Sequence, residues 1–75
     1  MENKYFIHRI KRNGGTITKG ILVADTYDIA KQKYRAYLEA YAYGHEKGTD
    51  FVSCMVSDLY GAILLHETWN SSVPV

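Results

Sequence analysis

Residues 51–69 have the sequence FVSCMVSDLYGAILLHETW, in which two largely apolar runs flank a short turn. Asp58 stands at the first position of this turn and Gly61 at the fourth, as a type I turn prefers. Successive side chains of a strand point to opposite faces, and apolar residues occupy successive positions here. The stretch therefore predicts a β-hairpin that is apolar on both faces, in a chain of only 75 residues.

An earlier hairpin is predicted where NGGT separates the extended runs KYFIHRIKR and TKGILVADT. Two extended runs around Asn-Gly-Gly are a strong hairpin signal and place strands at about residues 4–12 and 17–25. A turn centred on the two glycines pairs Ile7 with Leu22, and a turn centred one residue earlier shifts the pairing. The sequence leaves both registers open.

The segment between the hairpins, DTYDIAKQKYRAYLEAYAYG at residues 25–44, has the period of an amphipathic helix. Either Asp25 or Thr26 can cap its start, and Gly44 is a natural stop. Lysine, arginine and glutamate residues fall on the opposite, solvated side. The stripe that the helix must bury consists of Ala30, Tyr34, Tyr37, Leu38 and Tyr41.

The order of these elements predicts an α+β fold of the ββαββ type. The two hairpins form one four-stranded antiparallel sheet, and the helix packs on one face of it. We expect a single domain over residues 1–69 and a loose C-terminal tail, NSSVPV, over residues 70–75. The stability of so small a domain is only a few kcal/mol, because its core is thin.

The cysteine content and the charge pattern favour a cytoplasmic protein. Cys54 is the only cysteine, so no disulfide forms within the chain. The N-terminal residues are charged throughout, and no apolar run approaches the roughly 18 residues that span a bilayer. Modules of this order are common among small bacterial and phage proteins of unassigned role, which is an analogy of shape and does not fix a function. On this analogy a bacterial or phage accessory protein is expected.

Metal and cofactor sites are not predicted. His8, His45, His66 and Cys54 are the available soft ligands, and none of them forms a pair at metal-binding spacing. The glycines of NGGT precede a strand rather than a helix, so they form no phosphate-binding loop.

An enzyme is not predicted either. Ser53 and Ser57 lie in a strand without the sharp turn that exposes a nucleophile. Counting residues from the Asp58 turn pairs Cys54 with Leu65, which places His66 on the opposite side of the sheet from Cys54.

Basic residues gather near the N-terminus although the formal net charge is only +1. Residues 1–24 have a balance of +4 and residues 48–75 a balance of −3. A nucleic-acid-binding module is therefore the alternative function, since a basic two-stranded ribbon can contact phosphates. The candidate phosphate or anion contacts are Arg9, Lys11, Arg12 and Lys19.

Tyrosine is the outlying feature of the composition, with seven in 75 residues. Tyr34, Tyr37 and Tyr41 belong to the stripe that must be buried, where each ring packs on the sheet and its hydroxyl reaches the rim. Tyr43 and Tyr60 fall outside that stripe. We expect these two to be exposed aromatic contacts.

Self-association is the leading functional expectation, because one helix about 10 Å wide covers only one face of a four-stranded sheet. A second apolar face would exceed the few hundred Å² that a soluble monomer usually exposes. We therefore expect a homodimer that acts as a binding or accessory protein, with the uncovered face as the contact. The interface candidates are Met55 and Leu64 on one face, or Val56, Ile63, Leu65 and Trp69 on the other.

Overall fold

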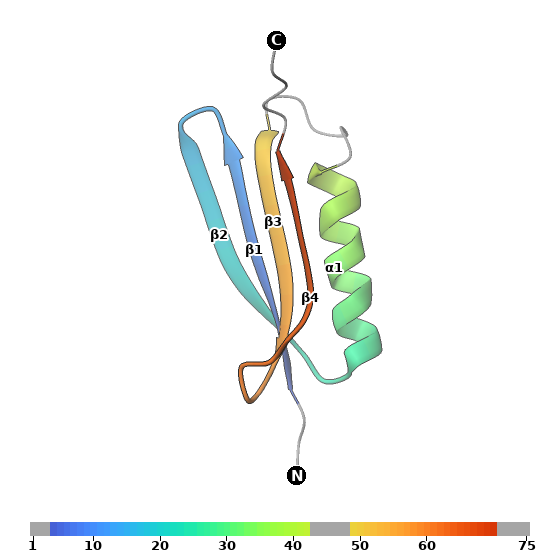
Figure 1. The fold of residues 1–75 in the computed structure, drawn as a ribbon. Helices are drawn as coiled ribbons and strands as arrows, with labels where there is room; N and C mark the ends of the chain where they lie inside the picture. The colour runs from blue at the N-terminus through green and yellow to red at the C-terminus, as the bar shows by residue number, and fades with distance from the viewer. Residues whose placement is uncertain (1–3, 43–48, 71–75) are drawn as a thin grey trace.

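The computed structural model describes residues 4–42 and 49–70 and confirms the predicted ββαββ fold (Figure 1). Four antiparallel strands form one sheet, and a single helix packs on it. The elements are β1 (Tyr5–Asn13), β2 (Thr16–Ala24), α1 (Tyr27–Tyr41), β3 (Thr49–Asp58) and β4 (Ile63–Asn70). β4 ends one residue inside the predicted tail, and residues 71–75 lie outside the described residues.

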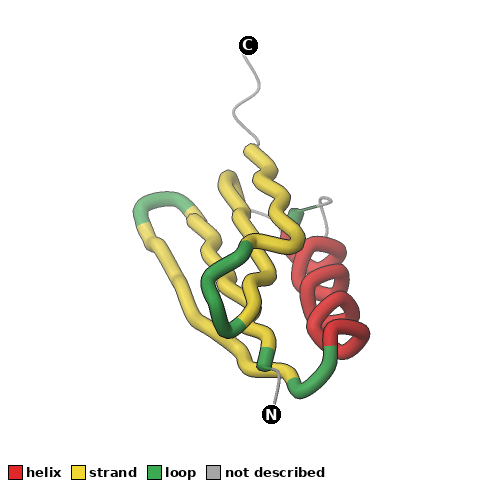
Figure 2. The backbone as a smooth tube through the Cα atoms, turned by 60° about the horizontal axis from the view of Figure 1, so that its bottom comes forward, coloured by secondary structure: helices red, strands yellow, loops and turns green. Residues whose placement is uncertain are grey.

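The strand order is β2-β1-β3-β4, so the first and third strands are the central pair. The chain leaves edge strand β2, passes through α1 on one side of the sheet, and returns in β3 beside β1 (Figure 2). Both faces of the sheet carry apolar side chains, and the part of the chain that the structure describes contains one helix to cover them. One of its faces lies against α1, and we call the other the open face.

The first hairpin adopts the register with the two glycines at the centre of its turn. Ile7 pairs with Leu22, and Asn13 pairs with Thr16. Gly14 has a φ of 62°, a left-handed conformation that a side chain disfavours. The pairing of Asn13 with Thr16 therefore decides between the two registers that the sequence left open.

The second hairpin has a register that the sequence did not predict. The Asp58 turn itself is confirmed, because Gly61 N–H donates to the Asp58 carbonyl at 3.2 Å. A β-bulge between Val56 and Ser57 then shifts the pairing, so that Cys54 lies opposite Glu67 rather than Leu65. Counting from the turn was wrong by two residues, because Ser57 already pairs with Ile63 rather than Ala62 and the bulge then adds one further residue to β4.

The bulge also moves Ile63 to the other face. The sequence placed Ile63 beside Val56, but it pairs with Ser57 and its side chain is 60% exposed. Beyond the bulge Val56 pairs with Leu65, and from there β4 alternates as expected.

The helix begins where a side chain caps its first turn. The Thr26 hydroxyl accepts a hydrogen bond from Ile29 N–H at 3.1 Å, while Asp25 contacts Lys4 instead. The helix proper ends at Tyr41 with Ala42 as its C-cap. The predicted stop, Gly44, lies outside the described residues.

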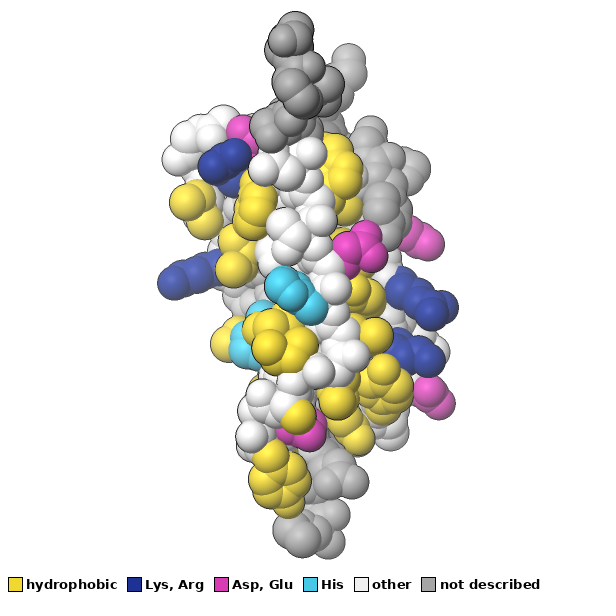
Figure 3. All heavy atoms as spheres, in the orientation of Figure 1, with side chains coloured by type: hydrophobic (Ala, Val, Ile, Leu, Met, Phe, Trp, Pro, Cys, Tyr) yellow, Lys and Arg dark blue, Asp and Glu magenta, His cyan; other side chains and the backbone are white. Residues whose placement is uncertain are grey.

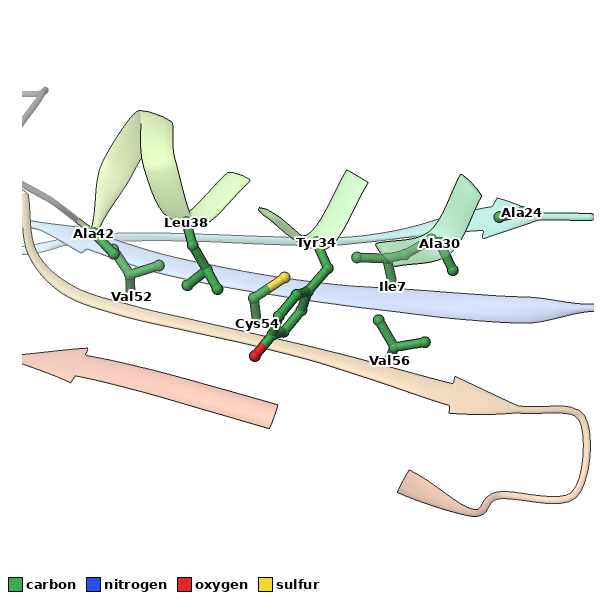
Figure 4. Close-up of a cluster of buried hydrophobic side chains, with 9 residues drawn as sticks. All are labelled: Ile7, Ala24, Ala30, Tyr34, Leu38, Ala42, Val52, Cys54 and Val56. Atoms are coloured by element: carbon green, nitrogen blue, oxygen red, sulfur yellow. The ribbon is translucent and has the colours of Figure 1, made fainter. Parts of the chain in front are cut away.

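The core lies between α1 and the sheet (Figure 4). Val56 is fully buried between the two strands that flank β3, where it pairs with Ile7 and Leu65. Leu65 and Trp69 are partly buried against the same cluster. The buried residues are Ile7, Ala24, Ala30, Tyr34, Leu38, Ala42, Val52, Cys54 and Val56.

Removing the Leu38 side chain tests how far the stability of the fold depends on the core between α1 and the sheet. Leu38 is 2% exposed, and Leu38→Ala is expected to lower the free energy of unfolding by about 2–5 kcal/mol because it leaves a cavity. Urea unfolding followed by circular dichroism measures the change. The control, Ile29→Ala, removes a 40% exposed side chain from the same helix and should lower it by less than about 1 kcal/mol. Equal losses would contradict the assigned core.

Candidate functional site

The open face of the sheet carries large apolar side chains that no described element covers. Edge strand β2 contributes Ile17, Ile21 and Val23, which are 66%, 59% and 56% exposed. Ile10 of β1 and Ile63 of β4 extend the apolar surface across the sheet. Figure 3 shows hydrophobic side chains beside the two histidine side chains on this side of the molecule.

Strand alternation explains why these residues share a face. In β1, Ile7 points toward α1, so its neighbours in sequence point away from it. Ile10 pairs with Lys19, and Phe6 pairs with Val23, which places all four on the open face. The same alternation shows which of the two predicted interface sets lies on the open face.

The predicted interface residues separate into two groups. Met55 lies half-buried on the open face, and Leu64 is exposed beside the bulge. Val56, Leu65 and Trp69 pack on the α1 side and belong to the core or its margin. The candidate interaction surface is therefore the face that carries Met55, with Ile63 added to it by the bulge.

A polar row crosses the centre of the open face. His8 pairs with Met55, and Met55 pairs with His66, so the two histidines stand on either side of Met55 rather than in contact. His66 Nε2 lies 3.4 Å from the hydroxyl oxygens of Ser53 and Thr68. These short polar side chains sit among apolar ones, as in the interior of many interfaces.

His8 Nε2 lies 3.0 Å from the Ser57 hydroxyl oxygen, a contact that the sequence analysis missed. The contact depends on the pairing of β1 with β3, residues that are far apart in the chain. Ser57 is buried, and the hydrogen bond satisfies its hydroxyl. A nucleophilic site also needs a group that orients the base and donors for an oxyanion, and the described residues place neither in hydrogen-bond contact with His8.

Cys54 is enclosed on the α1 side of the sheet. Its side chain is fully buried, whereas His66 lies on the open face, so the two cannot act as thiol and base. Desolvation raises the pKa of the Cys54 thiol from 9.0 to about 11, and the nearby Arg9 charge opposes part of that rise. A thiol with so high a pKa is a poor nucleophile at neutral pH.

The four predicted phosphate contacts do not form one surface. Arg9 and Lys11 point toward α1, whereas Arg12 and Lys19 belong to the open face. Arg12 Nε lies 2.9 Å from an Asp50 carboxylate oxygen, which neutralises much of its charge. Lys19 has a strand position on the open face, but on edge strand β2 it also borders the hollow that Arg9 and Lys11 line, so Arg12 is the residue set apart from the other three.

The tyrosines are distributed largely as the helix period predicts. Tyr34 is buried, and Tyr37 and Tyr41 are half-buried with ring centroids 4.8 Å apart. Tyr60 is 77% exposed in the β3–β4 turn. Tyr43 lies outside the described residues.

Metal ligands and membrane spans are not found in residues 4–42 and 49–70. Within those ranges no three histidine, cysteine, aspartate or glutamate side chains come together as ligands of a metal ion would. The helix in the same part of the chain is too short and too polar to cross a bilayer.

Comparisons with known proteins identify no relative. No protein-family model, curated protein or solved structure matches the chain. Its function is therefore inferred from the chemistry of its surfaces.

The buried thiol predicts a dependence of stability on pH. Between pH 9 and pH 11 the unfolded chain loses the Cys54 proton while the folded chain keeps it, so the free energy of unfolding falls as the pH rises. Below pH 9 the thiol is protonated in both states, and its contribution is fully present. Urea unfolding at several pH values should show this fall in the natural chain relative to Cys54→Ala.

The difference between the two chains removes the titration of tyrosines and lysines that both contain. Parallel curves between pH 9 and 11 would contradict the assigned environment of Cys54. As an independent readout, a disulfide reagent should label the thiol much faster in urea than in the folded protein.

Proposed function

We propose that the protein is a non-enzymatic binding or accessory protein that acts as a homodimer, joined through the open face of its sheet. The observation that carries the proposal is the row of exposed β-branched side chains, Ile17, Ile21 and Val23, beside Ile10 and Ile63. Exposed apolar surface of this extent usually marks an interaction site. A cytoplasmic setting belongs to the proposal, because the single cysteine makes no disulfide within the chain.

The size of the open face supports a specific contact. Four strands of about nine residues present a face of roughly 570 Å², from a spacing of about 4.8 Å and a rise of about 3.3 Å. Two such faces bury about 1,100 Å², which exceeds the roughly 1,000 Å² expected of a specific interface. The area is at the lower end of that range, so we expect dissociation in the micromolar region.

A second copy of the chain is the occupant that this surface fits. Its apolar side chains need an apolar partner, and a two-fold axis supplies one by pairing the patch with itself and closing the assembly. Twisted sheets pack face to face at about 10 Å with their strands about 30° apart. The ion pair of Arg12 with Asp50 lowers the cost of bringing like surfaces together.

The experiment compares a variant in the open face with a matched variant on the helix. Sedimentation equilibrium of the natural chain over a range of micromolar concentrations should give an average mass that rises with concentration from the single-chain mass of 8.6 kDa toward twice that value. Ile21→Glu places a charge within the proposed contact and should give a folded monomer. Ile29→Glu makes the same change at an exposed position of α1 and should leave the dimer unchanged.

The outcomes separate self-association from other uses of the surface. A natural chain that sediments as a clean monomer at these concentrations would contradict the proposal. A dimer that survives Ile21→Glu would also contradict it and would point to pairing of free strand edges instead.

A further inference from the structure

A second hollow surface lies on the other side of the sheet, between α1 and the first hairpin. Its volume is about 220 Å³, and it is lined by Arg9, Lys11, Thr18, Lys19, Gly20, Tyr37 and Tyr41. It exists because β2 is an edge strand whose inner positions here carry a threonine and a glycine, which fill little space. None of the described residues that line it is acidic.

Arg9 is the residue that gives the hollow a specific chemistry. Its Nε is buried without a hydrogen-bond partner in the part of the chain that the structure describes. Its guanidinium carbon lies 5.3 Å from the centroid of the Tyr37 ring, and a methyl group on Gly20 would lie 3.5 Å from its Nη2. A buried charged donor without an acceptor is unfavourable, so this group favours an incoming anion.

Lys11 brings a second positive charge to the same hollow. Its Nζ lies 3.8 Å from the centroid of the Tyr41 ring, a cation–π distance that fixes the ammonium group. Thr18 pairs with Lys11 in the sheet, so its hydroxyl is available on the same side. A guanidinium, an ammonium and a hydroxyl are the groups that proteins use for phosphate.

The negative end of the α1 dipole is an alternative explanation for cations in this hollow. Tyr37 and Tyr41 belong to its last turns, and the C-terminal end of a helix carries a partial negative charge. No basic residue lies in the last turn of α1 itself, so the ammonium group of Lys11 also interacts favourably with the negative end of the helix dipole. This interaction accounts for an ammonium near Tyr41 but leaves the buried Nε of Arg9 without an acceptor.

We propose that this hollow binds a phosphate group of a small ligand, held by Arg9 and Lys11 with Thr18, while Tyr37 and Tyr41 position the two cations. Its volume is below the roughly 300–1,000 Å³ of sites for drug-sized ligands, which suits free phosphate or the phosphate end of a mononucleotide. The site lies on the opposite side of the sheet from the open face and does not depend on the dimer.

Calorimetric titration at fixed low salt tests the proposal with three probes: inorganic phosphate, adenosine monophosphate and adenosine. We expect phosphate and the nucleotide to bind at millimolar concentration or below and adenosine not to bind. Similar affinities for the two anions would identify the phosphate group alone as the ligand. A tighter nucleotide would indicate that the tyrosine rings also contact the base.

Two variants change the site in different ways. Arg9→Gln removes the guanidinium and should weaken phosphate binding by about tenfold or more. Gly20→Val keeps every charge and fills the space beside Arg9, so it should have a similar effect. Lys33→Gln, on the exposed side of α1, removes the same charge as Arg9→Gln and should bind as the natural chain does.

Thermal unfolding is measured for each variant, because phosphate should raise the unfolding temperature of the natural chain and not that of Arg9→Gln or Gly20→Val. The proposal is overturned if the natural chain binds neither anion, if adenosine binds as well as its monophosphate, or if both site variants retain full affinity. Binding of a DNA oligonucleotide without binding of either small anion would also overturn it and would favour nucleic acid. Ile21→Glu should bind phosphate normally, whichever oligomer it forms.

Discussion

The architecture depends on one geometric constraint, which is that a single helix of 15 residues covers only one face of a four-stranded sheet. On the covered face, Val52, Cys54 and Val56 occupy alternate positions along β3 and are fully buried. The helix meets them with alanine, leucine and one tyrosine. Within residues 4–42 and 49–70, no element packs on the opposite face.

Strand alternation then divides the chemistry of the molecule in two. The open face receives isoleucines and valine together with histidine and serine, whereas the covered side receives the tyrosines and the cations that pack on them. The basic residues of β1 are the clearest case, since Arg9 and Arg12 lie on opposite sides of the sheet with different partners. Basic residues that are close together in the sequence can thus lie on opposite sides of the sheet.

The sequence was sufficient for the elements and their order, because a change of period and two turn signals identify them locally. It was insufficient for the second register, since the bulge at Val56 and Ser57 leaves no local mark. The serines of β3 do indicate which face of the sheet the helix covers. Ser53 and Ser57 alternate with apolar residues in β3, and their polar side chains belong to the face without the helix.

The sites were harder to foresee than the fold for the same reason. The hollow of Arg9 needs α1, β1 and β2 at once, and the contact of Ser57 with His8 joins residues 49 positions apart. Long-range pairing of this kind brings together side chains that no spacing rule relates.

The strand order also determines when the chain can fold during its synthesis. β1 is made first, but its second neighbour in the sheet is β3, and Ile7 becomes enclosed only when Val56 is beside it. In residues 4–42 alone, Ile7 and the buried side chains of α1 lack the β3 residues that they pack against. A nascent chain therefore exposes the apolar side chains of its N-terminal hairpin and helix until β3 has emerged from the ribosome.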